Sequence, residues 1–143
     1  MKKDSYIQKI SKLCLETEEA KGGHSLFAHT NHSNEELIER AHHLVLKTAT
    51  QFTITREEIL AWCQEALLDE EYQVPECVIE WLDDFSDGDD FLTTYSTENI
   101  IGYGFKIINN HVKRIDCTAI QLVLRKNDDG TDFYLVTAFP IEE

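Results

Sequence analysis

The chain has 143 residues, 42% of them hydrophobic, and a formal net charge of −14 at pH 7. This length predicts one domain that buries most of its unfolded surface without disulfides. No apolar run reaches membrane-spanning length, and Lys2-Lys3 is followed by Asp4 instead of the apolar stretch of a secretory signal. We therefore expect a soluble chain with no membrane partner.

The N-terminal segment predicts an amphipathic helix over residues 4–20. Gly22-Gly23 would end it in the way that glycine commonly ends helices. We divide the chain here, into an N-terminal amphipathic helix over 1–21 and a larger domain over 22–143. The apolar positions of this helix are Ile7, Ile10, Leu13 and Cys14.

Two capping boxes, Ser33–Glu36 and Thr55–Glu58, predict the starts of two further helices. Arg40 falls on the apolar stripe of the first, so its guanidinium should be half buried and close to an anion. The rest of that stripe is Leu37, Ala41, Leu44 and Val45. The inner face of the second helix is Ile59, Trp62, Cys63, Ala66 and Leu67. Pro75 suits the first turn of a third, short helix. That helix carries Val78, Trp81 and Leu82.

The pattern changes to β-strands after the acidic SDGDD turn at 86–90. The sequence NDDG at 127–130 predicts a hairpin between the last two strands. Helices followed by antiparallel strands are typical of an α+β domain. The predicted strands are 91–95, 100–108, 119–125 and 133–139. On the last of these, Thr137 and Phe139 should share one face.

The four cysteines predict reduced structural thiols. They lie far apart in the sequence and form no C-x-x-C pair, which argues against a zinc ribbon or a redox motif. A core of this size does not need disulfides, and a reducing cytosol is the simplest setting. The cysteines are Cys14, Cys63, Cys77 and Cys117.

The negative charge is concentrated in one segment. Between Ile59 and Ile100 there are twelve Asp or Glu and no Lys or Arg, so that −12 of the −14 belongs here and the remaining 101 residues carry −2. This acidic segment is either a solvated face with an acidic loop or a docking surface for a basic partner. It lacks the ligand pattern of an EF-hand, so calcium is not predicted.

The histidines are the remaining candidates for chemistry. No P-loop, dinucleotide-binding glycine pattern, H-E-x-x-H or G-x-S-x-G occurs. Five histidines lie within 24–43, but no carboxylate or thiolate falls at a spacing that would complete a zinc site, and no metal is predicted. A surface or hydrogen-bonded role is the default for each one. They are His24, His29, His32, His42 and His43, with His111 farther along.

One arrangement of these residues points to a family. The stretch GGHSLFAHTNHSNEELIERA at 22–41 resembles the start of the RNase A-like domain at the C-terminus of bacterial contact-dependent growth inhibition toxins. The resemblance rests on the Gly-Gly-His lead at 22–24, a second histidine at His29, and Arg40 on a helix eleven residues later. It continues in order through TATQF at 48–52, VIEWL at 78–82, IGYGF at 101–105, IQLVLRK at 120–126 and YLVTAFP at 134–140.

The resemblance implies a fold like that of pancreatic ribonuclease, with N-terminal helices packed on a C-terminal curved antiparallel sheet and no disulfides. It implies an active site made of His29, Arg40, Thr137 and position 139. The family has Tyr at that last position and this chain has Phe139, and the family's Arg-His-Val-Gly is replaced by AHTN at 28–31. Three residues are candidates for an accessory role in place of the missing hydroxyl: His24, Tyr134 and His111.

These residue types suit the cleavage of RNA by its own 2′-hydroxyl. A histidine can take or give a proton near neutral pH, an arginine fork fits a phosphate, and Thr137 can donate to a phosphate oxygen or a base edge. We therefore expect a metal-independent endoribonuclease that needs no cofactor. The family also implies a cognate immunity protein that covers the active site. It further implies delivery into a neighbouring cell, with a cytoplasmic site of action there.

Phe139 leaves alternatives open. One acid–base or oxyanion group is typically worth about 10²–10⁴ in rate, whereas enzymes commonly accelerate reactions by roughly 10⁶ or more. We therefore expect a weakened enzyme rather than an inactive one. The alternatives are a non-catalytic binding protein on the same fold and, because of the acidic segment, an acidic inhibitor that mimics RNA for a basic nuclease.

Overall fold

The computed structural model describes residues 1–22 and 29–143. Its helices are α1 (Lys3–Ser11), α2 (Leu15–Ala20), α4 (Asn34–His43), α5 (Arg56–Leu67) and α6 (Val74–Asp83). Its strands are β1 (Thr48–Phe52), β2 (Phe91–Ser96), β3 (Gly102–Ile108), β4 (His111–Cys117), β5 (Ala119–Lys126) and β6 (Phe133–Ile141). The predicted α+β class is confirmed. No helix in the described ranges is long and apolar enough to cross a membrane.

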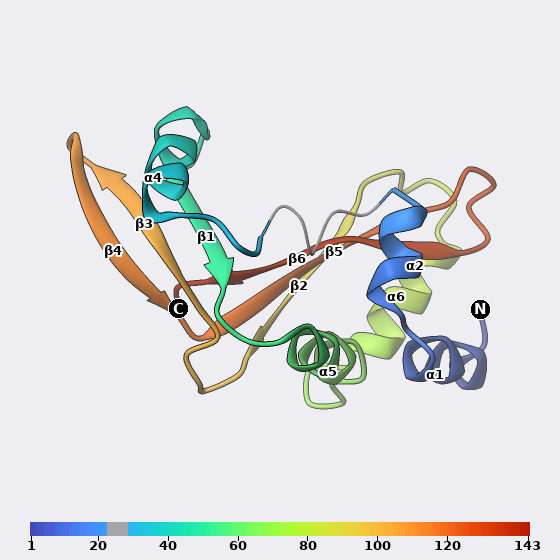
Figure 1. Cartoon of the computed structure of the whole chain (residues 1–143). Coiled ribbons are helices and arrows are strands. Elements are labelled where there is room, and N and C mark those ends of the chain that lie inside the picture. The colour runs from blue at the N-terminus through green and yellow to red at the C-terminus, as the bar shows by residue number, and fades with distance from the viewer. Residues whose placement is uncertain (23–28) are drawn as a thin grey trace.

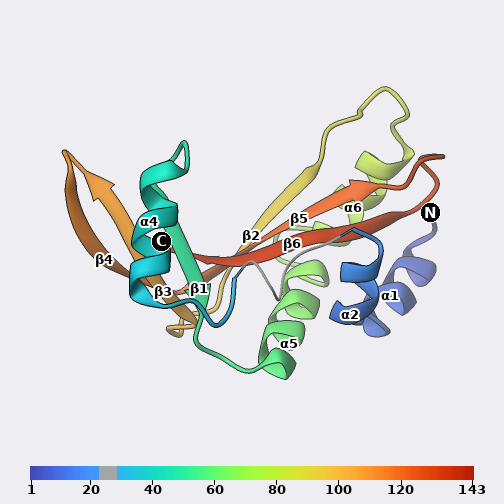
Figure 2. The same cartoon turned by 45° about the horizontal axis from the view of Figure 1, so that its top comes forward.

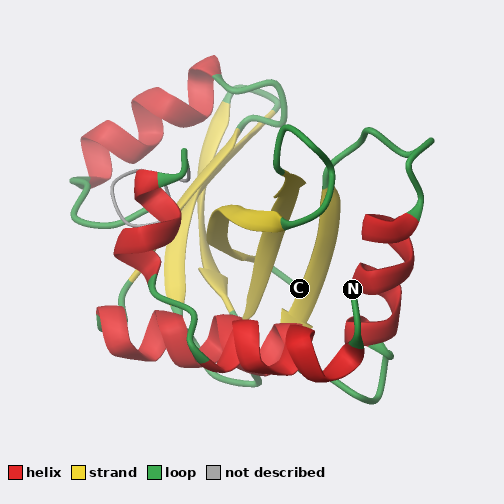
Figure 3. Cartoon of the chain, turned by 90° about the vertical axis from the view of Figure 1, so that its right-hand side faces the viewer, coloured by secondary structure: helices red, strands yellow, loops and turns green. Residues whose placement is uncertain are grey.

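The strands form two three-stranded antiparallel sheets, in the orders β1-β3-β4 and β2-β5-β6. We call them sheet one and sheet two. Figure 1 shows α4 beside sheet one, and α1, α2, α5 and α6 gathered around sheet two, an arrangement that Figure 2 repeats from another angle. From the side of the N-terminus, helices surround the strands (Figure 3). The chain therefore has two parts, and β6 is the long strand that runs between them.

The predicted helix over 4–20 is wrong in one respect, because it is two helices. Cys14 is extended (φ −137°, ψ 120°) and stands at the N-cap of α2. The break lets α1 pack on α5 and α6 while α2 packs on β6, two surfaces that one straight helix would not reach together. Gly22, with φ 118°, follows the end of α2 as predicted; its neighbour at 23 lies outside the described residues.

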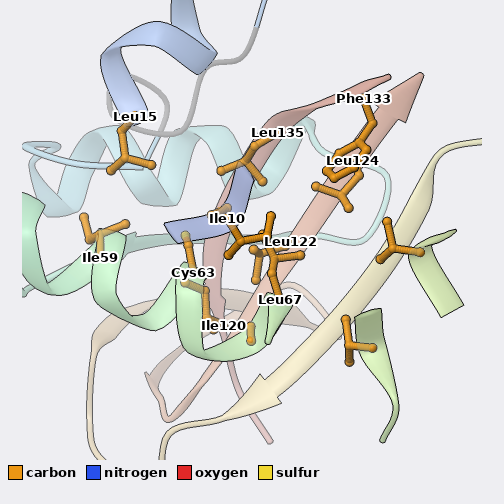
Figure 4. Close-up of a cluster of buried hydrophobic side chains, with 14 of the residues drawn as sticks. Ile10, Leu15, Ile59, Cys63, Leu67, Ile120, Leu122, Leu124, Phe133 and Leu135 are labelled. Carbon is orange, nitrogen blue, oxygen red and sulfur yellow. The ribbon is translucent and has the colours of Figure 1, made fainter. Parts of the chain in front are cut away.

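Both N-terminal helices belong to the main hydrophobic core. Tyr6 is fully buried and its hydroxyl donates to the Leu67 carbonyl of α5 at 2.7 Å. Ile10 and Leu15 lie in the same cluster as side chains of α5, β5 and β6 (Figure 4). Each such aliphatic side chain stabilises the fold by roughly 1.5–3 kcal/mol when fully buried. Residues 1–21 and the larger domain therefore share one core, and the boundary at residue 21 stays a prediction.

The second capping box and the third helix are confirmed. The Thr55 side chain accepts from the Glu58 N–H at 3.2 Å, and Glu58 accepts in return from the Thr55 N–H. The predicted inner face of α5 is buried except for Trp62, which is partly exposed. Pro75 lies in the first turn of α6. The predicted side chains of α6 are all buried: Val78, Trp81 and Leu82.

Helix α4 begins at the predicted capping box, with the Ser33 oxygen accepting from the Glu36 N–H. Its Leu37 and Ala41 pack on Ala49 of β1 and Phe105 of β3 in a second, smaller core. The rest of the predicted stripe is wrong. Leu44 and Val45 are 41% and 96% exposed, because α4 ends at His43 and the chain turns back into β1.

Two strands, β1 and β4, were not predicted, so the strands do not all follow the helices. Their sequences are TATQF and HVKRIDC. Strand β1 alternates small and polar side chains, and the edge strand β4 is mostly charged and exposed. Neither pattern has the apolar alternation by which half-buried strands are recognised.

Two glycines of β3 allow neighbouring strands to approach closely, and one of them faces β6. A Cβ at Gly104 would lie 2.1 Å from the Ala49 carbonyl oxygen, and a Cβ at Gly102 would lie 2.7 Å from a Pro140 ring carbon. The Thr50 hydroxyl also donates to the Pro140 carbonyl at 2.7 Å. Gly104 therefore allows the close pairing of β3 with β1, and Gly102 provides the space in which the end of β6 crosses sheet one.

All four cysteines lie in the described ranges and are free thiols, as predicted. Cys63 and Cys117 are buried, and burial raises the pKa of each thiol to about 12. A thiol with such a pKa holds its proton at neutral pH and is a poor nucleophile. These two cysteines therefore act as small apolar residues in the core.

Candidate active site

A cavity of about 580 Å³ lies where β6 crosses sheet one. We call it the central cavity. Its lining includes all four residues that the sequence assigned to the active site: His29, Arg40, Thr137 and Phe139. They come from the segment before α4, from α4 and from β6, so the fold unites positions more than one hundred residues apart.

His29 is positioned through its backbone and its ring. Its carbonyl accepts a hydrogen bond from the Phe52 N–H at 2.7 Å, at the end of β1. Its imidazole lies against the Phe139 ring, with centroids 5.4 Å apart and planes inclined by 34°. This tilted contact is within the range of favourable aromatic pairs, and it fixes the imidazole beside β6.

The segment after His29 is held by the buried side chain of Gln51. Its oxygen accepts from the His32 N–H at 2.6 Å and its nitrogen donates to the His32 carbonyl at 2.8 Å. Gln51 also donates to the Tyr103 hydroxyl at 2.9 Å, which in turn donates to the Asn34 side chain at 2.7 Å. This network ties sheet one to the start of α4. Hydrogen-bond networks of this kind make the local structure more rigid.

Arg40 lies in the last turn of α4 and is half buried, as predicted. It lines the central cavity and also a shallower hollow of about 450 Å³ on the outer side of α4. The packing of Leu37 and Ala41 below fixes which face of α4 Arg40 occupies. The planar guanidinium offers five donors in a fixed fork, the geometry that suits a phosphate.

A β-bulge directs Thr137 and Phe139 into the central cavity. The pairing of β5 with β6 shifts by one residue between Val123 and Leu124, so that Leu124 pairs with Leu135 and Val123 pairs with Thr137. A single extra residue inverts the alternation of side chains along a strand. Leu135 therefore points into the main core, whereas Thr137, two residues later, lines the cavity.

The Thr137 hydroxyl is available for a ligand. Thr137 is only 7% exposed, and its oxygen has no hydrogen-bond partner within the part of the chain that the structure describes. A buried hydroxyl without a partner is costly in free energy. Its position in the lining of a cavity indicates a group that is satisfied when a polar ligand is bound.

Several cavity residues were missed from the sequence. Lys106 of β3 adds a second fixed cation, and its ammonium lies 2.7 Å from the Glu142 carboxylate, which also lines the cavity. Gln121 of β5 lies opposite Phe139 in register. An apolar wall completes the lining: Leu44, Leu46, Ile115, Pro140 and Ile141. No sequence motif marks Lys106 or Glu142, which meet only where β6 crosses sheet one.

Two of the three accessory candidates, Tyr134 and His111, do not line the central cavity. His24 lies outside the described residues. Tyr134 lines a different hollow, together with Lys21 and Arg125, and His111 is exposed at the start of β4. Among the residues that the structure describes, no group of three or more His, Cys, Asp or Glu could hold a metal ion.

The sequence from residue 23 to residue 140 matches the family model of the bacterial CdiA-CT RNAse A domain. The chain belongs to this family. The solved structure of a CdiA-CT/CdiI complex from Y. kristensenii 33638 is similar to it, with a TM-score of 0.64, 19% identity, and coverage of 83% of this chain and 99% of that chain. A search of curated proteins found no match.

The family confirms the resemblance that the sequence motifs indicated, and the solved structure confirms the fold. In this CdiA-CT RNase A domain, the helices α1 and α2 precede the part that matches the family model. At the level of the family, the domain is a ribonuclease toxin of contact-dependent growth inhibition.

Proposed function

We propose that this CdiA-CT RNase A domain is a metal-independent endoribonuclease that cleaves RNA through the RNA's own 2′-hydroxyl. The observation that carries the proposal is the common position of His29, Arg40 and Thr137 in one cavity, with a buried Thr137 hydroxyl that lacks a partner among the described residues. A proton-transfer group, a phosphate-binding fork and a neutral donor then face one ligand.

The cleavage is a transphosphorylation. The 2′-oxygen attacks phosphorus, the bond from phosphorus to the 5′-oxygen breaks, and a 2′,3′-cyclic phosphate and a 5′-hydroxyl result. One proton leaves the 2′-hydroxyl and one proton reaches the 5′-oxygen, and an imidazole such as that of His29 can serve one of these transfers. Arg40 and Thr137 stabilise the negative charge that builds on the phosphoryl oxygens.

Phe139 removes one hydroxyl from this arrangement without removing the ring. The Phe139 ring still packs on the His29 imidazole, so the position keeps its packing role. A missing acid–base or oxyanion group costs about 10²–10⁴ in rate, less than the total acceleration of most enzymes. The enzyme is therefore weakened, and not inactive.

The net charge of −14 repels RNA, which is also negatively charged. Positive side chains in the cavity nevertheless attract RNA locally. Arg40 and Lys106 line the cavity, and the acidic segment at 59–100 contributes none of its known lining residues. Several carboxylates of that segment are held in ion pairs, such as Asp90 with Arg125 and Glu76 with Lys3. Phosphate contacts depend on cations at the site itself, so the two charge patterns are compatible.

The experiment is RNA cleavage by the purified domain in EDTA. We expect the wild type to cut single-stranded RNA and His29→Ala to lose nearly all activity. His42→Ala is the matched control, because His42 is exposed on α4 and does not line the cavity. Equal cleavage by the wild type and His29→Ala would remove the proposal.

A cognate immunity protein that covers the central cavity is the expected partner. The similar solved structure is a complex of CdiA-CT with CdiI, and the cavity rim here includes Leu46, which is 86% exposed. In a cell that lacks the partner, the domain would act on RNA after delivery into the cytoplasm. Co-purification with the product of a neighbouring reading frame, lost with Leu46→Asp, tests this.

Phe139 favours one other function, that of a non-catalytic binding protein on the same fold. Such a protein would use Arg40 and Thr137 to hold RNA without cutting it. It would bind RNA with the wild-type cavity and show no cleavage above the His29→Ala background. A wild type that cuts RNA with multiple turnovers excludes it.

A further inference from the structure

We propose that Lys106 is a further phosphate-binding residue of the central cavity, and that the Glu142 carboxylate occupies its ammonium group until the RNA phosphate replaces it. This inference rests on the proposed function, because it assigns a second cation and a built-in competitor to the same site. It identifies the substrate group as a phosphodiester that bridges Arg40 and Lys106.

The two cations reach the cavity from different elements. Arg40 comes from α4, and Lys106 comes from β3 in the centre of sheet one. Lys106 pairs with Thr48 of β1 in register, and Thr48 and Thr50 line the same cavity. Because side chains two residues apart share one face of a strand, this face of sheet one presents Lys106 to the cavity. A ligand in the cavity would then contact Arg40 from α4 and Lys106 from β3.

The Glu142 carboxylate can occupy the position at Lys106 that a substrate phosphate would take, because both groups present negatively charged oxygens. The Glu142 carboxylate oxygen lies 2.7 Å from the Lys106 ammonium, the distance that charge-assisted hydrogen bonds to carboxylates and phosphates share. Among the described residues that line the cavity, Glu142 supplies the only carboxylate. One negative oxygen at this ammonium can therefore be exchanged for another, with little change in geometry.

Replacing the Glu142 carboxylate by a phosphate costs little free energy, because the ion pair between Lys106 and Glu142 is open to water. The side chains of Lys106 and Glu142 are 27% and 37% exposed, and ion pairs of this kind contribute little to stability. A phosphodiester that Arg40 and Thr137 already hold would arrive at Lys106 with its position fixed, which favours it over the carboxylate. Glu142 therefore lowers the affinity of the cavity for anions without closing it.

The experiment measures binding and cleavage separately. Binding is titrated with inorganic phosphate and with a 2′-O-methylated RNA oligonucleotide, which cannot be cleaved by its own 2′-oxygen. We expect Lys106→Gln to weaken binding of the oligonucleotide and to lower kcat/KM on ordinary RNA, each by about tenfold, the loss of one charge-assisted phosphate contact. We expect Glu142→Gln to tighten binding by about three- to tenfold, the gain from removing a competing ion pair.

Each variant has a matched control of equal charge change. Lys113→Gln is the control for Lys106→Gln, because Lys113 lies opposite Lys106 in register on β4 but outside the cavity lining. Glu143→Gln is the control for Glu142→Gln, since the Glu143 carboxylate accepts from Ser96 and Thr118 instead. Both controls should bind the oligonucleotide within about twofold of the wild type, as expected for exposed charges in moderate salt.

The double variant decides whether Glu142 acts through Lys106. If it does, Glu142→Gln gives no gain in a Lys106→Gln background, because the two changes share one interaction. An equal gain in both backgrounds, or a loss in Lys113→Gln equal to that in Lys106→Gln, overturns the inference. Circular dichroism and thermal unfolding of each variant exclude misfolding as the cause.

The results separate this inference from the proposed function. If the wild type cuts RNA through His29 while Lys106→Gln behaves like the wild type, the inference fails and the proposed function remains. If no variant cuts RNA but Glu142→Gln still tightens binding through Lys106, the inference about phosphate binding is supported and the cleavage proposal fails. Absence of binding to either probe overturns the inference.

Discussion

The His29 imidazole and the Phe139 ring lie 5.4 Å apart, centroid to centroid, in the wall of the central cavity. One comes from the segment before α4 and the other from the last strand, and the bulge in β6 makes the contact geometrically available. The contact places position 139 directly beside the group that we propose for proton transfer. A hydroxyl added to this ring would therefore join a site that already has its other parts.

We predict that Phe139→Tyr increases kcat/KM for RNA cleavage by about 10- to 100-fold, because it supplies one donor beside His29 at the low end of the range for such groups. Steady-state kinetics on a fluorogenic RNA measure the change. In a His29→Ala background the gain should vanish. A Phe139→Tyr variant with wild-type kinetics would show that the phenol has no part in this cavity.

Arg40→Lys keeps the charge of the α4 site but removes its planar fork. We predict a loss of about tenfold or more in kcat/KM, because an ammonium cannot make two parallel hydrogen bonds to one phosphate. The control is Arg56→Lys, since Arg56 forms an exposed ion pair with Glu16 outside the cavity. Equal activities of Arg40→Lys and the wild type would mean that charge alone is needed at position 40.

Gly104→Ala tests the close pairing of β3 with β1 in sheet one. The added Cβ would lie 2.1 Å from a backbone oxygen of Ala49. Backbone atoms of a paired strand can shift only at a large cost in free energy. We predict a loss of about 3 kcal/mol or more in the free energy of unfolding. The control is Gly88→Ala, where a Cβ would meet nothing within 4 Å. Urea denaturation that gives similar stabilities for the two variants would contradict this close pairing of β3 with β1.

Asp90→Asn tests the link between the acidic segment and β5. Arg125 donates to both Asp90 oxygens, at 3.0 and 2.9 Å, and thereby lowers the pKa of the Asp90 carboxyl. A carboxyl with a lowered folded-state pKa stabilises the fold above its unfolded-state pKa, and this stabilisation is lost as the pH falls through the folded-state value. Because the pair is partly exposed, we predict a cost of only about 0.5–1 kcal/mol at pH 7.

The measurement is the difference in the free energy of unfolding between Asp90→Asn and the wild type, from urea denaturation between pH 7 and about pH 3, close to and below the ordinary aspartate pKa. The difference should shrink toward the acidic end. Asp89→Asn is the control, because among the described ion pairs none involves Asp89. A difference that stays constant with pH would show that the variant acts through packing and not through charge.

Local signals in the sequence were sufficient for part of the fold. The capping boxes at Ser33 and Thr55 and the proline at Pro75 predicted three helix starts, because a helix start depends on a few neighbouring residues. The break at Cys14 and the exposure of Val45 were missed. Both depend on the direction that the following element takes in the tertiary structure, and local sequence does not determine that direction. Strand β1 was missed because its partner β3 lies far along the sequence, and β4 was missed because it is mostly charged and exposed.

The candidate site could be predicted in part, for a similar reason. His29, Arg40 and Thr137 were named from family motifs, and the structure brings them to one cavity. Lys106 and Glu142 belong to no motif. They meet where β6 crosses sheet one at Gly102, a tertiary contact that the periodicity of the sequence does not indicate. The bulge that orients Thr137 is likewise invisible in the alternation of its strand.

The central claim is that the cavity containing His29, Arg40 and Thr137 cleaves RNA by its own 2′-hydroxyl. The most direct test is the chemistry of the new RNA ends after incubation with the wild-type domain in EDTA, analysed by mass spectrometry beside His29→Ala and His42→Ala. We predict 2′,3′-cyclic phosphate and 5′-hydroxyl ends from the wild type and His42→Ala, and almost none from His29→Ala. Intact RNA, or fragments with 5′-phosphate ends, would contradict the claim.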